Sequence, residues 1–220
     1  MKNIAGPPVL GDDLYGRSYE ISRLWELLDQ GHHILMLAPR RTGKTSLMQE
    51  LERDPQPNWD VIFVDLQAGD SADDLIAAIL ARLARHPRYR TWLEASGLKE
   101  AVSSLLNRLS LSIDAEVARV EIKGAIAGDW QHAAEVLARR LADPPDPDRR
   151  LLVILDELPI LISRLLRNGQ KAESEAILSW LREIRLTPGL RGRVGTLLGG
   201  SIGLDGVLRR ARPSDTINDL

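Results

Sequence analysis

The sequence predicts an α/β fold built on a doubly wound, mainly parallel sheet with helices on both faces. Three short apolar runs, residues 33–37, 61–65 and 151–155, have the length and composition of strands that are buried on both faces. Segments with apolar residues at helical spacing separate these runs. A strand and helix alternation of this kind indicates parallel strands joined by helical crossovers.

Length and composition limit the class of protein. The chain has 220 residues, of which 44% are hydrophobic and 27% charged, so we expect residues 1–220 to form one soluble domain with a small insert. The formal net charge of -2 gives no basic field for tight, non-specific binding of nucleic acid. The absence of cysteine excludes disulfides, thiol catalysis and cysteine-ligated zinc.

Targeting signals are not evident in the sequence. No apolar run approaches the roughly 20 residues that span a bilayer, and residues 1–8 lack the apolar middle of a secretion signal. We therefore expect a cytoplasmic protein with no membrane partner.

The first helix follows a lead-in rich in glycine and proline. Ile21, Leu24, Trp25 and Leu28 share one helical face, and Gly31 stands where the helix should end. The strand at residues 33–37 comes directly after it.

A phosphate-binding loop is predicted next. Residues 38–45 read A-P-R-R-T-G-K-T, which matches the pattern G-x-x-x-x-G-K-[ST] except that Ala38 replaces the first glycine. In this pattern backbone amides and the lysine hold phosphates, and the final hydroxyl binds magnesium. The alternative is an ordinary loop between a strand and a helix. The candidate nucleotide-binding residues are Arg40, Arg41, Thr42, Gly43, Lys44, Thr45 and Ser46.

The acidic partner of this loop follows the apolar run 151–155. Parallel strands carry ligand-binding groups at their carboxyl ends, which is where Asp156 and Glu157 stand. We expect Asp156 to hold magnesium together with Thr45, and Glu157 to activate the attacking water, with Lys44 as the second catalytic residue. The alternative is a carboxylate pair that caps a helix.

A family resemblance rests on the segment before the first helix. Gly16-Arg17 and Glu20 form a Gly-Arg-x-x-Glu box upstream of the phosphate loop, which resembles the N-terminal segment of AAA+ ATPases. The loop itself, P-R-R-T-G-K-T, is similar to that of the archaeal-type ATPases of the STAND branch. The resemblance implies a P-loop NTPase fold in which Tyr15, Gly16 and Arg17 lie against the adenine. The alternative is an ordinary turn at Gly16.

An insert is predicted at about 85–128, after a helix that Ser71 and Asp74 should cap. It contains a helical pattern at 98–106. Apolar and polar residues then alternate at 109–113 and 118–122, which predicts a β-hairpin outside the core. Packing against adjoining helices is the expected role. A partner-binding or nucleic-acid-probing hairpin stays open, although the lack of aromatic residues there argues against base stacking.

The later part of the chain continues the alternation. An amphipathic helix should follow Asp129, further helices should cover 159–167 and 177–184, and a fourth strand should cover 193–201. In the AAA+ resemblance, Ser201 occupies the place of a polar residue that senses the γ-phosphate. The alternative is a serine that caps the helix predicted after it.

The C-terminal part holds a predicted helix at 205–212 and an edge strand at 214–220. The AAA+ resemblance implies a helical lid after the core, and the sequence has no room for one. We therefore expect an excised domain or a natural fragment that binds nucleotide weakly and turns it over slowly. The arginines of this part indicate a solvated or docking surface, and none is assigned as an arginine finger.

The functional expectation is a magnesium-dependent domain that binds ATP or ADP, hydrolyses ATP slowly and acts as a nucleotide-controlled switch, with a homo-oligomer or flanking effector domains as partners. The main rival function is the ATPase module of a DNA-loading, replication or transposition protein, for which this sequence shows no recognition element. A nucleotide-binding scaffold without catalysis and a small-molecule kinase are less favoured, because Asp156-Glu157 suits water as the acceptor of the phosphoryl group.

Overall fold

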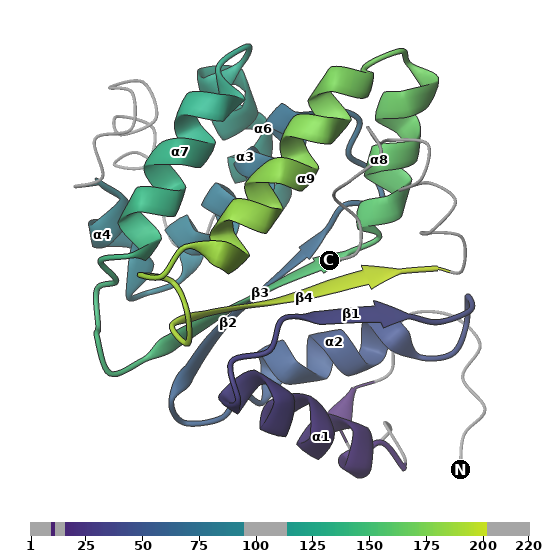
Figure 1. Ribbon diagram of the computed structural model, residues 1–220, viewed down its shortest axis with the longest axis vertical. Coiled ribbons are helices and arrows are strands. Elements are labelled where there is room, and N and C mark those ends of the chain that lie inside the picture. The colour runs from purple at the N-terminus through teal and green to yellow at the C-terminus, as the bar shows by residue number, and fades with distance from the viewer. Residues whose placement is uncertain (1–9, 12–15, 95–113, 202–220) are drawn as a thin grey trace.

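The computed structural model describes residues 10–11, 16–94 and 114–201 (Figure 1). Its centre is a four-stranded sheet with the order β1-β4-β3-β2, in which all neighbouring strands are parallel. The strands are β1 (Ile34–Leu37), β2 (Trp59–Asp65), β3 (Arg150–Asp156) and β4 (Val194–Gly200). The predicted α/β fold with a parallel sheet is thus confirmed.

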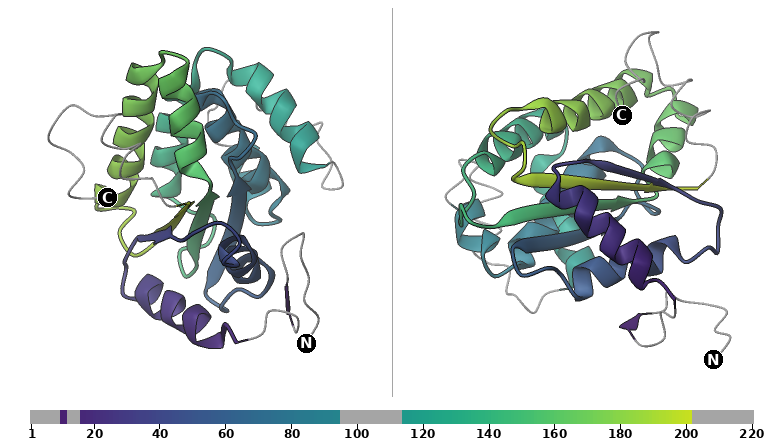
Figure 2. Two further views of the ribbon diagram at one scale, coloured as in Figure 1. Left: turned by 90° about the vertical axis from the view of Figure 1, so that its right-hand side faces the viewer. Right: turned by 60° about the horizontal axis from the view of Figure 1, so that its bottom comes forward.

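Helices cover both faces of this sheet. Helices α1 (Ser18–Asp29) and α2 (Lys44–Arg53) lie on one face, and both views of Figure 2 keep α1 on the opposite side of the sheet from α8 and α9. The helices on the second face are α3 (Ala72–Arg85), α7 (Trp130–Leu141), α8 (Leu158–Arg167) and α9 (Lys171–Leu186), with α4 (Tyr89–Glu94) and α6 (Ala115–Ile126) packed beside α3.

The strands are apolar on both faces because each face has its own core. In β2, Val61 and Phe63 belong to the cluster under α1 and α2, whereas Ile62 and Val64 belong to the larger cluster on the other side. Successive side chains of a strand point to opposite faces, so a continuous apolar run is required where both faces are covered. This is why the sequence pattern identified the strands.

Most predicted helices are confirmed. Leu24, Trp25 and Leu28 are the buried residues of α1, and Gly31 has the positive φ of 82° that suits a residue after a helix end. The Ser71 hydroxyl accepts a hydrogen bond from the Asp74 N–H at 3.3 Å and caps α3 as predicted.

The predicted β-hairpin is wrong in its second arm. Residues 118–122 lie inside helix α6, and they pack into the larger core instead of outside it. Ala118 and Ile122 are buried at a spacing of four, whereas Val120, which the strand pattern placed on the same face, is 68% exposed. The alternation of apolar residues was too short to distinguish the two periods.

Several predictions fall outside the described residues. These are Tyr15, the helix at 98–106, the first hairpin arm at 109–113, the helix at 205–212 and the edge strand at 214–220. Among the described residues, no helix combines the length and the apolar character needed to cross a membrane.

The strand order decides where the predicted site residues meet. Strand β4 lies between β1 and β3, so about 10 Å separates the strand before the phosphate loop from the acidic strand. Because all strands run the same way, the loop at 38–43, Asp156 and Ser201 lie at one edge of the sheet.

Candidate functional site

The loop between β1 and α2 is a tight turn. It is stabilised by one hydrogen bond inside the loop and one to the neighbouring strand β4. The Thr42 hydroxyl donates to the Pro39 carbonyl at 2.9 Å, and the Ala38 N–H donates to the Gly200 carbonyl of β4 at 3.3 Å. Arg41 and Gly43 adopt left-handed backbone conformations, with φ of 67° and 80°. Gly43 reaches this conformation without strain because it has no side chain, and the chain can then enter the helix at Lys44.

Helix α2 begins at the end of this loop. A helix leaves the N–H groups of its first turn without partners inside the helix, and its dipole places partial positive charge there. Lys44, Thr45 and Ser46 form this first turn. The arrangement favours an oxyanion in front of the loop.

Asp156 is the acidic centre of the site. It ends β3, is 2% exposed, and its carboxylate accepts hydrogen bonds from Lys44 Nζ at 2.5 Å and from Thr45 Oγ1 at 2.6 Å. The Glu157 N–H donates to the same carboxylate at 3.0 Å. The structure therefore brings together the lysine and hydroxyl of the loop with the predicted metal carboxylate, across the width of β4.

Gly199 makes the space that this arrangement needs. A Cβ atom on Gly199 would lie 2.5 Å from Asp156 Oδ1 and 2.6 Å from the terminal carbon of Met48. Only a glycine in β4 leaves room for the carboxylate to turn toward α2. Gly199 was not identified from the sequence, where the Gly199-Gly200 pair at the end of the fourth predicted strand was the available signal.

Glu157 faces the same ammonium group. Its φ of 56° is unusual for a residue with a side chain, and this turn connects β3 to helix α8. Glu157 Oε1 lies 3.6 Å from Lys44 Nζ, and Oε2 is buried without a hydrogen-bond partner. The predicted catalytic pair Glu157 and Lys44 is thus in contact, with one carboxylate oxygen still able to accept a proton or a hydrogen bond.

A cavity of about 340 Å³ opens beside the loop. Arg17 connects the two, because its guanidinium donates to the Thr42 carbonyl at 2.7 Å and to Glu20 at 2.6 Å. Of the three residues expected near an adenine, Arg17 lines this cavity, Gly16 lies just before α1, and Tyr15 is outside the described residues. The apolar lining residues Leu24, Met36, Ala38 and Leu47 were not identified from the sequence.

The remaining predicted residues lie around this centre. Arg40 and Arg41 are exposed on the loop, and Ser46 is buried in the first turn of α2. Ser201 directly follows β4 and is partly buried. No three His, Cys, Asp or Glu side chains of the described residues come close enough together to form a metal site by themselves.

Comparisons of the whole chain give no relatives. No family model, no curated protein and no solved structure matches it.

Proposed function

We propose that this protein is a magnesium-dependent, ATP-binding P-loop domain that hydrolyses ATP slowly and uses the nucleotide as a switch. One observation carries the proposal: Lys44 and Thr45 both contact the buried carboxylate of Asp156. The parallel sheet, with the loop and the acid at one edge, is compatible with this fold. Membership of the AAA+ and STAND group rests on the resemblance of residues 16–20 and 39–45 alone.

Phosphate binding would use the loop and the first turn of α2. The amides of Thr42 and Gly43 and the Lys44 ammonium are the groups that hold the β- and γ-phosphates in such a loop. Lys44 now contacts Asp156 and Glu157. A triphosphate offers the same ammonium a stronger set of oxygens, so binding would move Lys44 from the carboxylates to the phosphates.

The oxygen ligands present fit a magnesium ion. Magnesium prefers oxygen donors and is commonly held by one or two protein groups together with phosphate and water. The Thr45 hydroxyl and the Asp156 carboxylate, 2.6 Å apart, are such groups. When bound, the metal would neutralise charge on the phosphates.

Glu157 would orient the attacking water and accept its proton. Its Oε2 atom is buried and lacks a hydrogen-bond partner, and it belongs to a residue held in a strained backbone conformation beside Lys44. Strain of this kind, of order 1–3 kcal/mol, is often found where a side chain must be placed for catalysis.

The base would lie in the cavity beside the loop. Arg17 and Leu24 line it from the side of α1, and Met36 and Leu47 from β1 and α2. An apolar cavity with a few polar groups suits a flat heterocycle. This placement keeps the base next to the phosphates.

The test is ATP binding and hydrolysis by wild type and by Glu157→Gln, with and without DNA. We expect Glu157→Gln to bind ATP normally and to hydrolyse it at least about a hundredfold more slowly, since a general base contributes about 10²–10⁴. Glu26→Gln, which removes an exposed carboxylate on α1, is the matched control. Wild-type hydrolysis by Glu157→Gln contradicts the assigned role, and stimulation by DNA would favour the DNA-handling alternative.

A further inference from the structure

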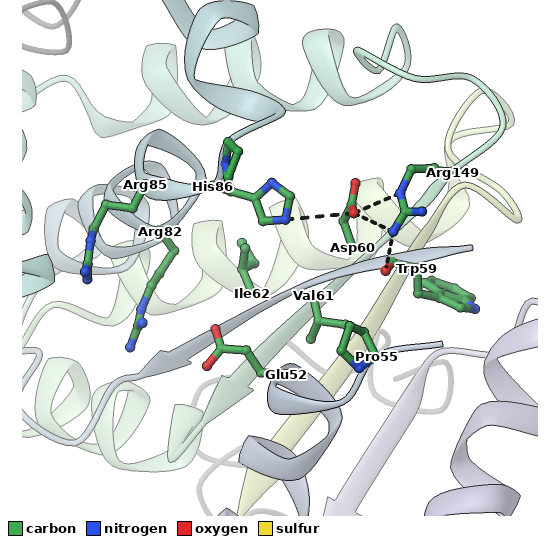
Figure 3. Close-up of a pocket in the computed structure, with 11 residues that line it drawn as sticks. Glu52, Pro55, Trp59, Asp60, Val61, Ile62, Arg82, Arg85, His86 and Arg149 are labelled. Atoms are coloured by element: carbon green, nitrogen blue, oxygen red, sulfur yellow. Dashed lines mark hydrogen bonds and ion pairs between the residues drawn. The ribbon is translucent and has the colours of Figure 1, made fainter. Parts of the chain in front are cut away.

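A second cavity, of about 390 Å³, lies at the other end of the sheet (Figure 3). It is formed where β2 begins, where α3 ends and where the chain enters β3 at Arg149. Arg149 and Asp156 stand at opposite ends of β3, so about 20 Å separates this cavity from the nucleotide site. Its charged and titratable lining residues are Glu52, Asp60, Arg82, Arg85, His86 and Arg149.

One wall of the cavity is already neutralised. Asp60 is 5% exposed, and its Oδ1 atom lies 2.9 and 2.7 Å from two nitrogens of Arg149. The Arg149 guanidinium also donates to the carbonyls of Pro57 and Trp59, and Arg88 Nε adds a further positive charge 3.5 Å from Asp60. These groups therefore hold the start of β2 and have little capacity left for a ligand anion.

The opposite wall has unused positive charge. Arg82 and Arg85 stand in the last turn of α3, and neither side chain makes a hydrogen bond or a close ion pair with another of the described residues. The Nε atom of Arg85 is buried without an acceptor. Figure 3 shows both side chains on the same side of the cavity, near Glu52. A buried N–H donor without an acceptor is unfavourable, so this wall favours an oxyanion.

Glu52 does not satisfy these arginines. Its carboxylate accepts the N–H of Phe63 at 2.9 Å, on the free edge of β2 among the described strands. Burial raises the pKa of Glu52, although Arg82 and Arg85 act in the opposite direction. Two guanidinium groups therefore face a single carboxylate that is itself poorly solvated, and the balance of charge on this wall is positive.

His86 supplies a polar group without adding charge at neutral pH. Burial lowers its pKa, against the raising effect of Asp60, whose Oδ1 atom lies 3.8 Å from His86 Nε2. Its other ring nitrogen, Nδ1, is buried without a hydrogen-bond partner. Besides Arg85 Nε, the cavity lining thus has two further buried atoms without a hydrogen-bond partner, His86 Nδ1 and Asp60 Oδ2. A ligand that carries a hydroxyl group as well as an oxyanion could satisfy them.

We propose that this cavity binds a small oxyanion-bearing molecule, a phosphate monoester or a carboxylate, whose anionic group lies between Arg82 and Arg85. The forked donors of arginine match the oxygens of both groups. The cavity volume is in the range of sites for small organic ligands and larger than an inorganic anion needs. Pro55 and Pro87, which are exposed and line the cavity, offer apolar surface for the organic part of the ligand. This inference is independent of the proposed function.

The test is a titration of the whole chain with glycerol 3-phosphate, inorganic phosphate and citrate, followed by backbone amide NMR. We expect the His86 and Arg85 amides to shift with a dissociation constant of about 1 mM, because these probes fill only part of the cavity. Preference for glycerol 3-phosphate or for citrate identifies the class of anion. The Gly43 amide reports on the nucleotide site in the same spectra, so failure at one site is distinguished from failure at the other.

Substitutions decide whether the arginine pair carries the binding. The double variant Arg82→Gln/Arg85→Gln should bind at least about tenfold more weakly, whereas Arg139→Gln, which removes an exposed arginine of α7, should bind as wild type. Glu52→Gln keeps an acceptor for Phe63 and removes a competing charge, so it should bind severalfold more tightly. Absent shifts at His86, or equal affinity in wild type, the double variant and Glu52→Gln, overturn the proposal.

Discussion

Two buried aspartates, Asp156 and Asp74, are both paired with cations, but their surroundings differ. Asp156 contacts Lys44 and Thr45, and Lys44 also lines an open cavity of about 340 Å³. Asp74, 5% exposed, accepts from Arg119 at 3.0 Å and Lys123 at 2.8 Å, both on α6, and from Ser71 at 2.9 Å.

The difference lies in where the cation could go. Lys44 is a compact charge on a flexible stem beside open space, so phosphate oxygens can replace its carboxylate partners. The planar guanidinium of Arg119 is 9% exposed and joins α6 to α3 inside the fold. Burial of an ion pair therefore does not by itself indicate a functional site. Lys44 differs from Arg119 in the open space beside it and in the flexibility of its side chain, and this difference makes the Asp156 pair the candidate ligand site of the two.

The largest expected effect is on nucleotide binding in Lys44→Ala. Loss of this ammonium should weaken ATP binding by at least about a hundredfold, because charge-assisted contacts to phosphate are lost. Isothermal titration calorimetry with ATP measures this loss. Arg119→Ala is the control, and it should bind ATP as wild type does under conditions in which it remains folded. If Lys44→Ala binds ATP as tightly as wild type, Lys44 does not hold the phosphates, and the proposed difference in role between Asp156 and Asp74 is wrong.

Arg119→Ala should have the largest effect on stability. Removing this partner of a buried carboxylate should lower the free energy of unfolding by about 3 kcal/mol. Urea unfolding followed by circular dichroism measures it. Arg139→Ala, which breaks an exposed pair with Glu135, should change stability by less than about 1 kcal/mol. Equal effects of the two substitutions would mean that the network does not hold α6 in place.

Gly199→Ala should damage the proposed nucleotide site and leave the fold intact. The added methyl group meets Asp156 and Met48, so the carboxylate must move, with a loss of about 1–3 kcal/mol of stability and weaker magnesium-dependent ATP binding. Gly195→Ala in the same strand is the matched control, since its nearest contact is the side chain of Leu28 at 3.1 Å. If both variants bind ATP alike, the space at Gly199 is not needed for binding.

The pH dependence of stability should report on Asp74. Burial raises its pKa, but hydrogen bonds from Lys123, from the Asp70 N–H and from Ser71 outweigh it and hold the pKa below the usual 3.8. A lowered pKa contributes stability above pH 3.8 that is lost as the pH falls below that value. Urea unfolding between pH 6 and pH 3 measures this dependence, which should be weaker in Asp74→Asn. An unchanged slope in that variant would assign the acid sensitivity to other groups.

The smallest expected effect is that of Arg17→Gln. Its guanidinium lies at the surface, where a hydrogen bond to the Thr42 carbonyl is partly screened by water. We expect ATP affinity to fall a few-fold, because the loop loses one constraint beside the cavity. Arg23→Gln, which also lines that cavity but pairs with Glu26, is the control. If Arg23→Gln loses more ATP affinity than Arg17→Gln, then Arg23 and not Arg17 is the arginine that contacts the base.

The sequence was most informative where one local pattern allowed one structure. The continuous apolar runs correctly predicted β2 and β3, because strands that are covered by helices on both faces need apolar residues at every position. The residues 118–122 were misread because five residues fit a strand and a helix equally well, and the core contacts of Ala118 and Ile122 decide for the helix. The importance of Gly199 depends on its contacts with Asp156 and Met48, and that of Arg82 and Arg85 depends on the cavity that they line. Neither can be predicted from the local sequence.

The sequence by itself determined the α/β class, most of the elements and the identity of the loop and acidic residues, because these depend on short-range periodicity and residue chemistry. Only the tertiary structure decided that β4 separates β1 from β3, that Asp156 still meets Lys44 and Thr45 across it, and that a second cavity forms at the start of β2. Strand order and cavity shape arise from contacts between residues far apart in the chain, which no local pattern contains.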